Sequence, residues 1–202
     1  MKIGLIQASS QRDKNQILEA CLRRTAPEGA EVINFGIFGD SSVSLSYVQI
    51  ALCISLLLES RAVDFVVTGC SSGQGMALAC NSLPGVLCGY VQNPTDAALF
   101  GRINDGNAVS YPLGFGWGWA ARINLEHTLE ALFSAPFGTG YPPEEAERKQ
   151  RDARKLKQMN RLCKRELAEF LPQMDQEVVD GALSYRPVAD YVSKFGAEKK
   201  WR

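Results

Sequence analysis

Residues 64–81 read DFVVTGCSSGQGMALACN, and this stretch decides how the chain folds. Its first half is an apolar run that ends at Cys70 and is typical of a buried strand. A glycine-rich turn follows, and residues 75–82 have the composition of a helix. A strand that passes through a tight turn into a helix is the repeating unit of α/β proteins. The stretch therefore predicts one such unit, with a thiol at the carboxyl end of its strand.

The same alternation of apolar strands and helical stretches continues on both sides. Strands are expected at residues 2–7, 30–36, 65–69, 86–92 and 108–113, and helices at residues 14–24, 47–61, 75–82, 95–102 and 120–134. Near-continuous apolar strands predict a parallel sheet that helices cover on both faces. We therefore expect an α/β fold: a doubly wound, Rossmann-like, five-stranded parallel sheet that binds ligands at the carboxyl ends of its strands.

The pattern changes after the breaker segment PFGTGYPP, residues 136–143. We expect residues 1–140 to form one Rossmann-like domain, and residues 141–202 to form a helical C-terminal extension that packs on the domain or on a dimer partner. Residues 148–165 carry nine basic residues and one acid at helical spacing. They predict either a surface helix with a solvated basic face, or a helix that turns one or two arginines toward a phosphate. Short helices and a mobile end are expected after Leu171.

Charge, hydropathy and cysteine content limit the classes of function that the chain can have. The 202 residues contain 22 basic and 22 acidic side chains, so charge favours neither a nucleic-acid nor a membrane partner. The longest apolar stretch, near residues 50–58, is too short to span a bilayer. No signal peptide is evident, so we expect a cytoplasmic protein. The six cysteines form no CxxC pair and His127 is the one histidine, so no metal site is expected.

Cys70 is the candidate catalytic residue of this turn. Because the turn runs into a helix, unpaired backbone N–H groups and the positive end of a helix dipole are expected beside the thiol. Such a position favours a thiolate and stabilises negative charge that develops next to it. The alternative is that Cys70 only packs at a strand end, as buried cysteines often do.

Three kinds of cysteine chemistry make different demands on the residues around Cys70. A cysteine phosphatase needs an arginine six residues later, where this chain has Met76, so that chemistry is excluded. Thiol–disulfide exchange needs a second cysteine close by, but serines and a glycine follow. Proton transfer at a carbon next to a carbonyl needs a base, an oxyanion stabiliser and a polar group. Cys70, the amides of residues 71–75 and the Ser72 hydroxyl supply these three groups.

Several motifs carry a family resemblance. Residues 70–81, CSSGQGMALACN, resemble the CGTGxGMxxxxN signature of ribose-5-phosphate isomerase B and the galactose-6-phosphate isomerase subunits. Residues 104–107, NDGN, resemble the family's NDxN segment, and Tyr47 falls where the family has a tyrosine that contacts substrate. The similarity covers roughly residues 1–137. The order and spacing of the motifs indicate a divergent member of this family.

The resemblance implies an enzyme of carbohydrate metabolism, an aldose–ketose isomerase that acts on a phosphorylated sugar through a cis-enediol(ate), without metal or organic cofactor. It implies that Cys70 shuttles a proton between C1 and C2 and that Ser72 binds the substrate oxygens. The implied substrate contacts are Ser9, Ser10, Tyr47, Ser71, Gly73, Gln74, Gly75 and Asn104. The family is typically a homodimer in which the partner subunit completes each active site, so the same is expected here.

Departures from the family pattern are equally informative. The family's Asp-His pair after the first strand is replaced by residues 7–11, QASSQ, and its ring-opening histidine by Ile103. Tyr141 stands where an arginine is expected. The candidates to bind phosphate in its place are Arg148, Arg151, Arg154 and Arg12, with Arg102 behind them. Because isoleucine cannot transfer a proton, we expect a substrate other than ribose 5-phosphate, such as a short or unusual phosphosugar whose open-chain form is readily available.

Two other interpretations stay open at this point. The missing histidines and the unplaced phosphate arginine fit a catalytically inactive sugar-phosphate-binding protein of the same fold. A redox-responsive thiol protein is the third interpretation, and it predicts selective alkylation of Cys70.

Overall fold

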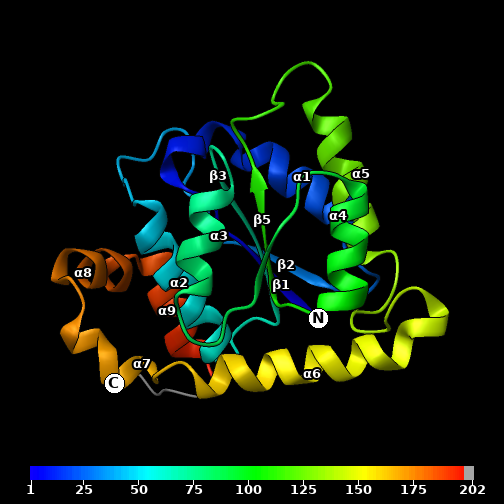
Figure 1. Cartoon of the computed structure of the whole chain (residues 1–202). Helices are drawn as coiled ribbons and strands as arrows, with labels where there is room; N and C mark the ends of the chain where they lie inside the picture. Colours follow the sequence, from blue (N-terminus) through cyan, green and yellow to red (C-terminus); the bar gives the residue numbers. More distant parts are fainter. Residues whose placement is uncertain (198–202) are drawn as a thin grey trace.

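One parallel sheet organises the molecule, and its strands lie in the order β2-β1-β3-β5-β4 (Figure 1). The structure is a computed structural model and describes residues 1–197. The strands are β1 (Lys2–Leu5), β2 (Glu31–Asn34), β3 (Phe65–Cys70), β4 (Cys88–Tyr90) and β5 (Ala108–Pro112). Every neighbouring pair is parallel. The predicted five-stranded, doubly wound α/β fold is confirmed.

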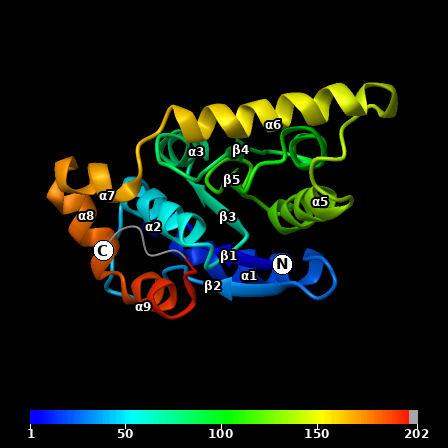
Figure 2. The ribbon, with the colours of Figure 1, turned by 90° about the horizontal axis from the view of Figure 1, so that it is seen from below.

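Helices cover both faces of the sheet (Figure 2). One face carries α1 (Asn15–Thr25), α4 (Pro94–Leu99) and α5 (Ala121–Phe133); the other carries α2 (Tyr47–Glu59) and α3 (Gln74–Asn81). Each face has its own apolar core. All six residues of β3 are buried, because this central strand meets a core on both sides.

The chain reverses its direction of winding between β1 and β3. From β1 it moves outward to β2, and from β3 it moves the other way to β4 and β5. The backbone of β1 continues to pair with β3 beyond the strand itself, because Ile6 N donates to Val67 O and Ala8 N donates to Gly69 O. In open α/β sheets ligands bind at such a switch point, beyond the carboxyl ends of the two strands.

Local chemistry explains where the helices begin. Ser46 and Gln49 form a capping box at the start of α2, and Asn93 caps α4 ahead of Pro94. The helix predicted at residues 95–102 is divided: α4 ends at Leu99 and a π-helical turn, η2 (Phe100–Asn104), follows. This turn leads into β5 and therefore lies at the amino end of that strand.

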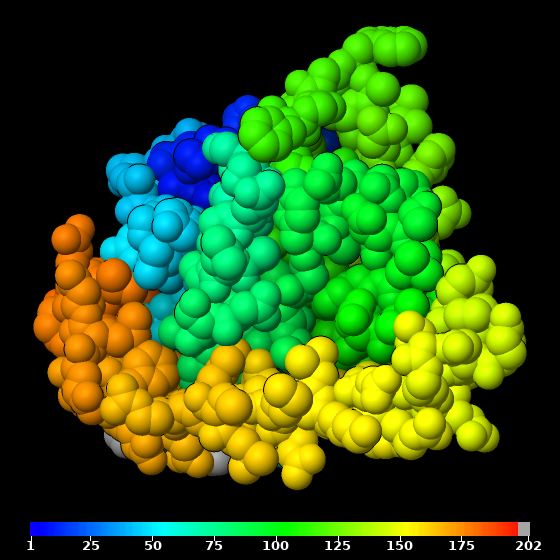
Figure 3. Space-filling view, viewed as in Figure 1, coloured from blue at the N-terminus to red at the C-terminus, as the bar shows by residue number. Residues whose placement is uncertain are grey.

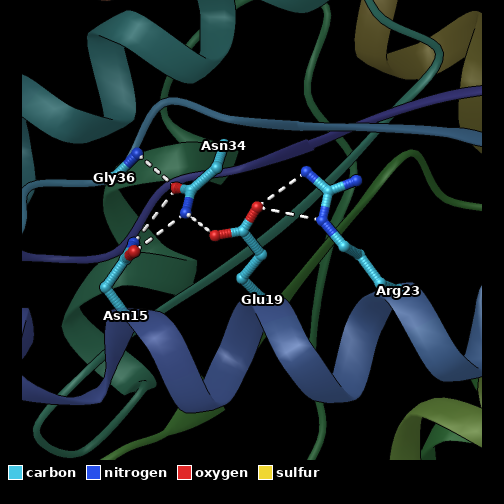
Figure 4. Close-up of polar contacts among 5 residues, drawn as sticks. All are labelled: Asn15, Glu19, Arg23, Asn34 and Gly36. Atoms are coloured by element: carbon cyan, nitrogen blue, oxygen red, sulfur yellow. Dashed lines mark hydrogen bonds and ion pairs between the residues drawn. The ribbon is translucent and has the colours of Figure 1, made fainter.

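A polar network anchors the carboxyl end of β2 (Figure 4). The Asn34 side chain accepts from Gly36 N, exchanges hydrogen bonds with Asn15 on α1, and donates to Glu19 Oε2 at 2.8 Å. Arg23 donates to the other Glu19 oxygen. Burial alone would raise the pKa of Glu19, but the hydrogen bonds from Asn34 and Arg23 lower it overall. The network holds the start of the β2–α2 loop on the first helix.

The C-terminal part contains α6 (Ala146–Leu162), α7 (Leu167–Phe170), α8 (Gln176–Ser184) and α9 (Arg186–Phe195). The last two cover the outer face of α2, so residues 50–58 are all buried and this all-round apolar helix lies inside the core. Tyr185 donates a hydrogen bond to Phe35 O at 2.7 Å, and burial raises the pKa of its phenol to about 12.

Among residues 1–197, none of the helices combines the length and the apolar character that crossing a membrane requires. The expected mobile end of the tail falls on residues 198–202, which lie outside the described residues.

Candidate active site

Cys70 is the last residue of β3 and pairs with Pro112 of β5. Its carbonyl accepts a hydrogen bond from Leu113 N at 2.9 Å. Its side chain belongs to the core face that α2 and α3 cover, and the residue keeps 9% of its surface exposed. Cys70 is therefore delivered to the carboxyl edge of the sheet, with limited access to the outside.

The turn after Cys70 is built on glycine. Gly73 has φ 74° and caps α3, and its carbonyl accepts from Ser110 Oγ at 2.7 Å. A Cβ on Gly73 would lie 2.6 Å from Tyr90 Cε2, and one on Gly69 would clash with Tyr111 O. Only glycine fits at both points. The amides of Gln74 and the next two residues open α3 and have no acceptor within the helix, so this end is suited to an anionic oxygen.

The end of β1 supplies the other side of the turn. A 3-10 helix, η1 (Ser9–Lys14), follows the strand, and Gln11 Nε2 donates to Ser71 Oγ at 2.8 Å. Ser9 is buried and its Oγ accepts from Leu45 N, whereas Ser10 is exposed. Of these two predicted substrate contacts, only Ser10 has an open surface in the single chain.

Arg12 is the one phosphate candidate placed at this end. Its Nε donates to Ser9 O at 3.0 Å, and one terminal nitrogen donates to Ser41 O at 2.6 Å. The guanidinium thus ties η1 to the β2–α2 loop. A partly exposed cation remains beside the carboxyl ends of the strands.

Two tyrosines border the turn. Tyr47 opens α2 and is 45% exposed, and a Cβ on Gly75 would lie 3.5 Å from its Cε2. Tyr90 ends β4 and covers Gly73. Burial raises the pKa of the Tyr90 phenol, with smaller contributions from the charges of Asp96 and Cys70. Tyr90 therefore stays a neutral hydroxyl at the candidate site through the neutral pH range.

The remaining predicted residues of the turn differ in access. Gln74 is exposed and Ser72 is half-buried, while Ser71 is exposed next to its partner Gln11. The loop after β5 begins here, because Gly114 N donates to Ser71 O at 2.7 Å. This loop carries Phe115 and Trp119, both exposed.

The other predicted residues belong to η2 and α6, and α6 runs past the end of the sheet opposite to Cys70 (Figure 1). Asn104 ends η2 at the amino side of β5. Helix α6 runs past the same end: Lys157 pairs with Asp105, and Asn160 Nδ2 donates to Val86 O just before β4. Three of the phosphate candidates share that location; they are Arg148, Arg151 and Arg154. Within one chain the fold does not bring these four residues to Cys70.

Two cavities lie away from Cys70. One of about 640 Å³ lies between α6 and the amino ends of the strands, and is lined by Lys157 and Asp105 among others. One of about 380 Å³ lies between the β2–α2 loop and the helices α8 and α9. Cys70 lines neither of them. In residues 1–197 no group of three or more His, Cys, Asp or Glu side chains is arranged to hold a metal ion.

Sequence reasoning missed Gln11 and Tyr90 as members of this cluster. Tyr90 ends a strand, so the rule that ligands meet the carboxyl ends of strands would have selected it. Gln11 had no comparable signal, because its partner Ser71 is 60 residues away.

Known proteins resemble this chain in sequence and in fold. The sequence profile of the ribose/galactose isomerase family matches residues 3–156. The crystal structure of a 4-deoxy-L-threo-5-hexosulose-uronate ketol-isomerase complexed with a tartrate is 41% identical, with a TM-score of 0.93, over 100% of this chain and 95% of that chain. The crystal structure of a ribose-5-phosphate isomerase from Vibrio parahaemolyticus is 37% identical, with a TM-score of 0.91, over 98% and 93% of the two chains.

More distant structures share the fold. The type B ribose 5-phosphate isomerase from Trypanosoma cruzi is 19% identical, with a TM-score of 0.66, and the match covers 79% of this chain and 98% of that chain. A search of curated proteins finds no match. The two structures with higher identity cover the C-terminal extension as well as the sheet, so the extension is not peculiar to this chain.

Proposed function

The chain belongs to the ribose/galactose isomerase family and is a sugar isomerase, and from this premise we propose that Cys70 is the base of an aldose–ketose isomerisation. The observation that carries the proposal is the position of Cys70 at the β1–β3 switch point, directly before the opening amides of α3. A base and a set of oxyanion donors in one turn are what enolisation needs.

The proposed reaction moves two protons. Cys70 Sγ removes the hydrogen from C2 of the aldose, and the C–H electron pair forms the C1–C2 double bond while the carbonyl oxygen takes up negative charge. The amides of residues 71–75 hydrogen-bond this enediolate oxygen. Cys70 then returns a proton to C1, and the Ser72 hydroxyl relays the proton of the C2 hydroxyl to the C1 oxygen. The product is the ketose, and no oxidant or cofactor is consumed.

The substrate we propose is an open-chain sugar acid. The relative with 41% identity is named for 4-deoxy-L-threo-5-hexosulose uronate. That compound has no C4 hydroxyl and carries a carbonyl at C5, so its aldehyde cannot close a ring through either position. An enzyme for it needs no ring-opening group, which agrees with Ile103 at the position of the family histidine.

Charge supports the same substrate class. A carboxylate carries one negative charge, whereas a phosphate monoester carries up to two and usually needs several cationic partners. The described chain places Arg12 at the Cys70 end, while the arginines of α6 lie at the other. A phosphorylated sugar is the second candidate, and it requires the α6 arginines of another subunit.

We propose that the active enzyme is a homodimer with its active sites at the subunit interface. A twofold axis that sets two chains side by side in opposite directions brings Asn104 and the α6 arginines of one chain to Cys70 of the other. The face that α3 and α6 share in Figure 3 is the surface we assign to this contact. It exposes Leu78, Met159 and Leu162. Exposed apolar side chains gathered on one face are typical of an interface.

Steady-state kinetics tests the proposal directly. With the deoxyhexosulose uronate and ribose 5-phosphate as substrates, we expect the uronate to give the higher kcat/KM. Cys70→Ala should lower kcat by about 10²–10⁴-fold, the usual contribution of a proton-transfer base, while Cys163→Ala, at an exposed cysteine, should leave it unchanged. Product formed in D₂O should carry deuterium, because the thiol proton exchanges with solvent.

Each result separates the candidates. A preference for ribose 5-phosphate contradicts the uronate assignment, and full activity of Cys70→Ala contradicts the base assignment. Calorimetric binding of sugar phosphates by the wild type, without turnover of any substrate, identifies the inactive binding protein instead. The inactive binding protein is motivated by the missing family histidines, in place of which this chain has QASSQ at residues 7–11 and Ile103.

A further inference from the structure

Gln11 joins the ends of two strands across the switch point. It lies in η1, departs from helical geometry at φ −119° and ψ 25°, and is 7% exposed. Its Nε2 donates to the hydroxyl of Ser71, the residue directly after Cys70, at 2.8 Å. A nearly buried polar side chain thus makes a hydrogen bond to an exposed hydroxyl next to the thiol.

The direction of this hydrogen bond decides what Ser71 can do. An amide nitrogen donates and cannot accept, so the Ser71 oxygen is the acceptor in this pair. The hydroxyl hydrogen of Ser71 is then free to point at another acceptor.

The pairing of the two strands does not depend on Gln11. The backbones of β1 and β3 are already joined at this level, because Ala8 N donates to Gly69 O at 2.9 Å. The Oε1 atom of Gln11 is buried and has no hydrogen-bond partner, which is unfavourable for folding. Gln7 gives the contrast: it is fully buried, and both ends of its amide are bonded, to Ile37 O and Asn15 Nδ2. Gln7 is a structural glutamine, and Gln11 differs from it.

We propose that Gln11 is a positioning residue, which keeps the Ser71 hydroxyl oriented as a hydrogen-bond donor to the carbonyl and enediolate oxygens of the substrate. The inference rests on the proposed isomerisation and adds a residue to it. Where the family resemblance implies a charged Asp-His pair after the first strand, this chain presents an uncharged amide–hydroxyl pair. Such a pair recognises an α-hydroxycarbonyl group without adding charge next to an anionic substrate.

The test uses Gln11→Glu and Gln11→Met, each alone and combined with Ser71→Ala. A carboxylate only accepts, so in Gln11→Glu it takes the Ser71 hydrogen away from the substrate. We expect kcat to fall about 10–100-fold at neutral pH with little change in KM, as for loss of one oxyanion donor. Relative to wild type at each pH, activity should recover as the pH falls and the new carboxyl group is protonated. Gln16→Glu, at an exposed position on α1, is the control for added charge.

The combined variants decide between positioning and a structural role. With Ser71→Ala present, neither Gln11 substitution should lower kcat further, because the hydroxyl they orient is gone. Gln11→Met should cost less than Gln11→Glu, since it releases the hydroxyl without capturing it. Equal losses with and without Ser71→Ala, or full activity of Gln11→Glu with no change in its pH profile, would overturn the proposal. If Gln11→Glu does not fold, the Gln11→Met and Ser71→Ala pair gives the same decision.

The outcome is independent of the base assignment. Cys70→Ala tests the isomerase chemistry, whereas the coupling between residues 11 and 71 is measured with Cys70 intact. If residues 11 and 71 show no coupling while the reaction still depends fully on Cys70, only the positioning role is rejected.

Discussion

The ring of Tyr90 lies directly against Gly73, so that a Cβ added to Gly73 would lie 2.6 Å from Tyr90 Cε2. This contact joins the end of β4 to the turn that follows Cys70. Gly73 also has a positive φ of 74°, a backbone conformation that residues other than glycine rarely adopt. Two separate effects, the positive φ and the contact with Tyr90, therefore require glycine at this position. The energetic cost of each can be measured.

Gly73→Ala should destabilise the protein by about 3 kcal/mol, because backbone strain and a steric clash add together. It should also abolish activity by displacing the turn. Gly29→Ala is the matched control, since Gly29 has the same φ of 74° and nothing within 4 Å of its added Cβ. Chemical denaturation should show a loss of about 1 kcal/mol for Gly29→Ala, with activity retained. Equal losses in the two variants would mean that the Tyr90 contact is unimportant.

Tyr90→Phe removes the neutral hydroxyl beside Cys70 and keeps the ring that covers Gly73. We expect kcat/KM to fall about 10-fold, the effect of one hydrogen bond to the reacting oxygens, with an unchanged melting temperature. Tyr141→Phe is the control, because Tyr141 is exposed and stacks on Arg102 instead. Initial-rate measurements on both variants check the prediction, and wild-type kinetics for Tyr90→Phe would exclude the phenol from the reaction.

The surface that exposes Leu78 and Met159 should be the subunit contact. Leu78→Asp and Met159→Asp should convert a dimer to a monomer and remove activity together, because each site then loses the partner's groups. Leu183→Asp, at an exposed leucine of α8, should change neither property. Light scattering after size-exclusion chromatography gives the mass in solution. A wild-type monomer with full activity would refute the shared site.

Glu19 should contribute stability that depends on pH. Its pKa in the folded protein lies below the ordinary value of 4.5, so its contribution is present above pH 4.5 and is lost as the pH falls through the lowered folded value. Glu19→Gln should therefore cost about 1 kcal/mol at pH 7, and the difference from wild type should shrink in acid. Urea unfolding between pH 7 and pH 3 checks this trend. Glu28→Gln, at an exposed position, is the control, and a cost for Glu19→Gln that stayed constant with pH would contradict the assignment.

Much of the fold could be read from the sequence because its signals are local. Each predicted strand from residues 2–7 to residues 108–113 overlaps an observed one, since an apolar run flanked by turn residues depends only on neighbours in the chain. The π-helical turn Phe100–Asn104 was not predicted, because its composition is that of an ordinary helix. The family resemblance was confirmed by the profile match over residues 3–156.

The candidate site was predictable only in part. The sequence placed Cys70 and its turn at a strand end. It did not reveal that Arg148 and Asn104 of the same chain lie at the opposite end of the sheet. Which end of the sheet a helix covers is decided by the tertiary surface on which the helix packs. A basic helix at the amino ends and one at the carboxyl ends have the same periodicity.

The sequence alone determined the order of the strand–helix units, the thiol at the end of β3 and the glycines of its turn. These follow from side-chain spacing and backbone sterics within a few residues. Only the tertiary structure decided that Gln11 meets Ser71, 60 residues away, and that Tyr90 covers Gly73. Such contacts depend on how strands distant in sequence are aligned in the sheet, and no short stretch of the chain contains that information.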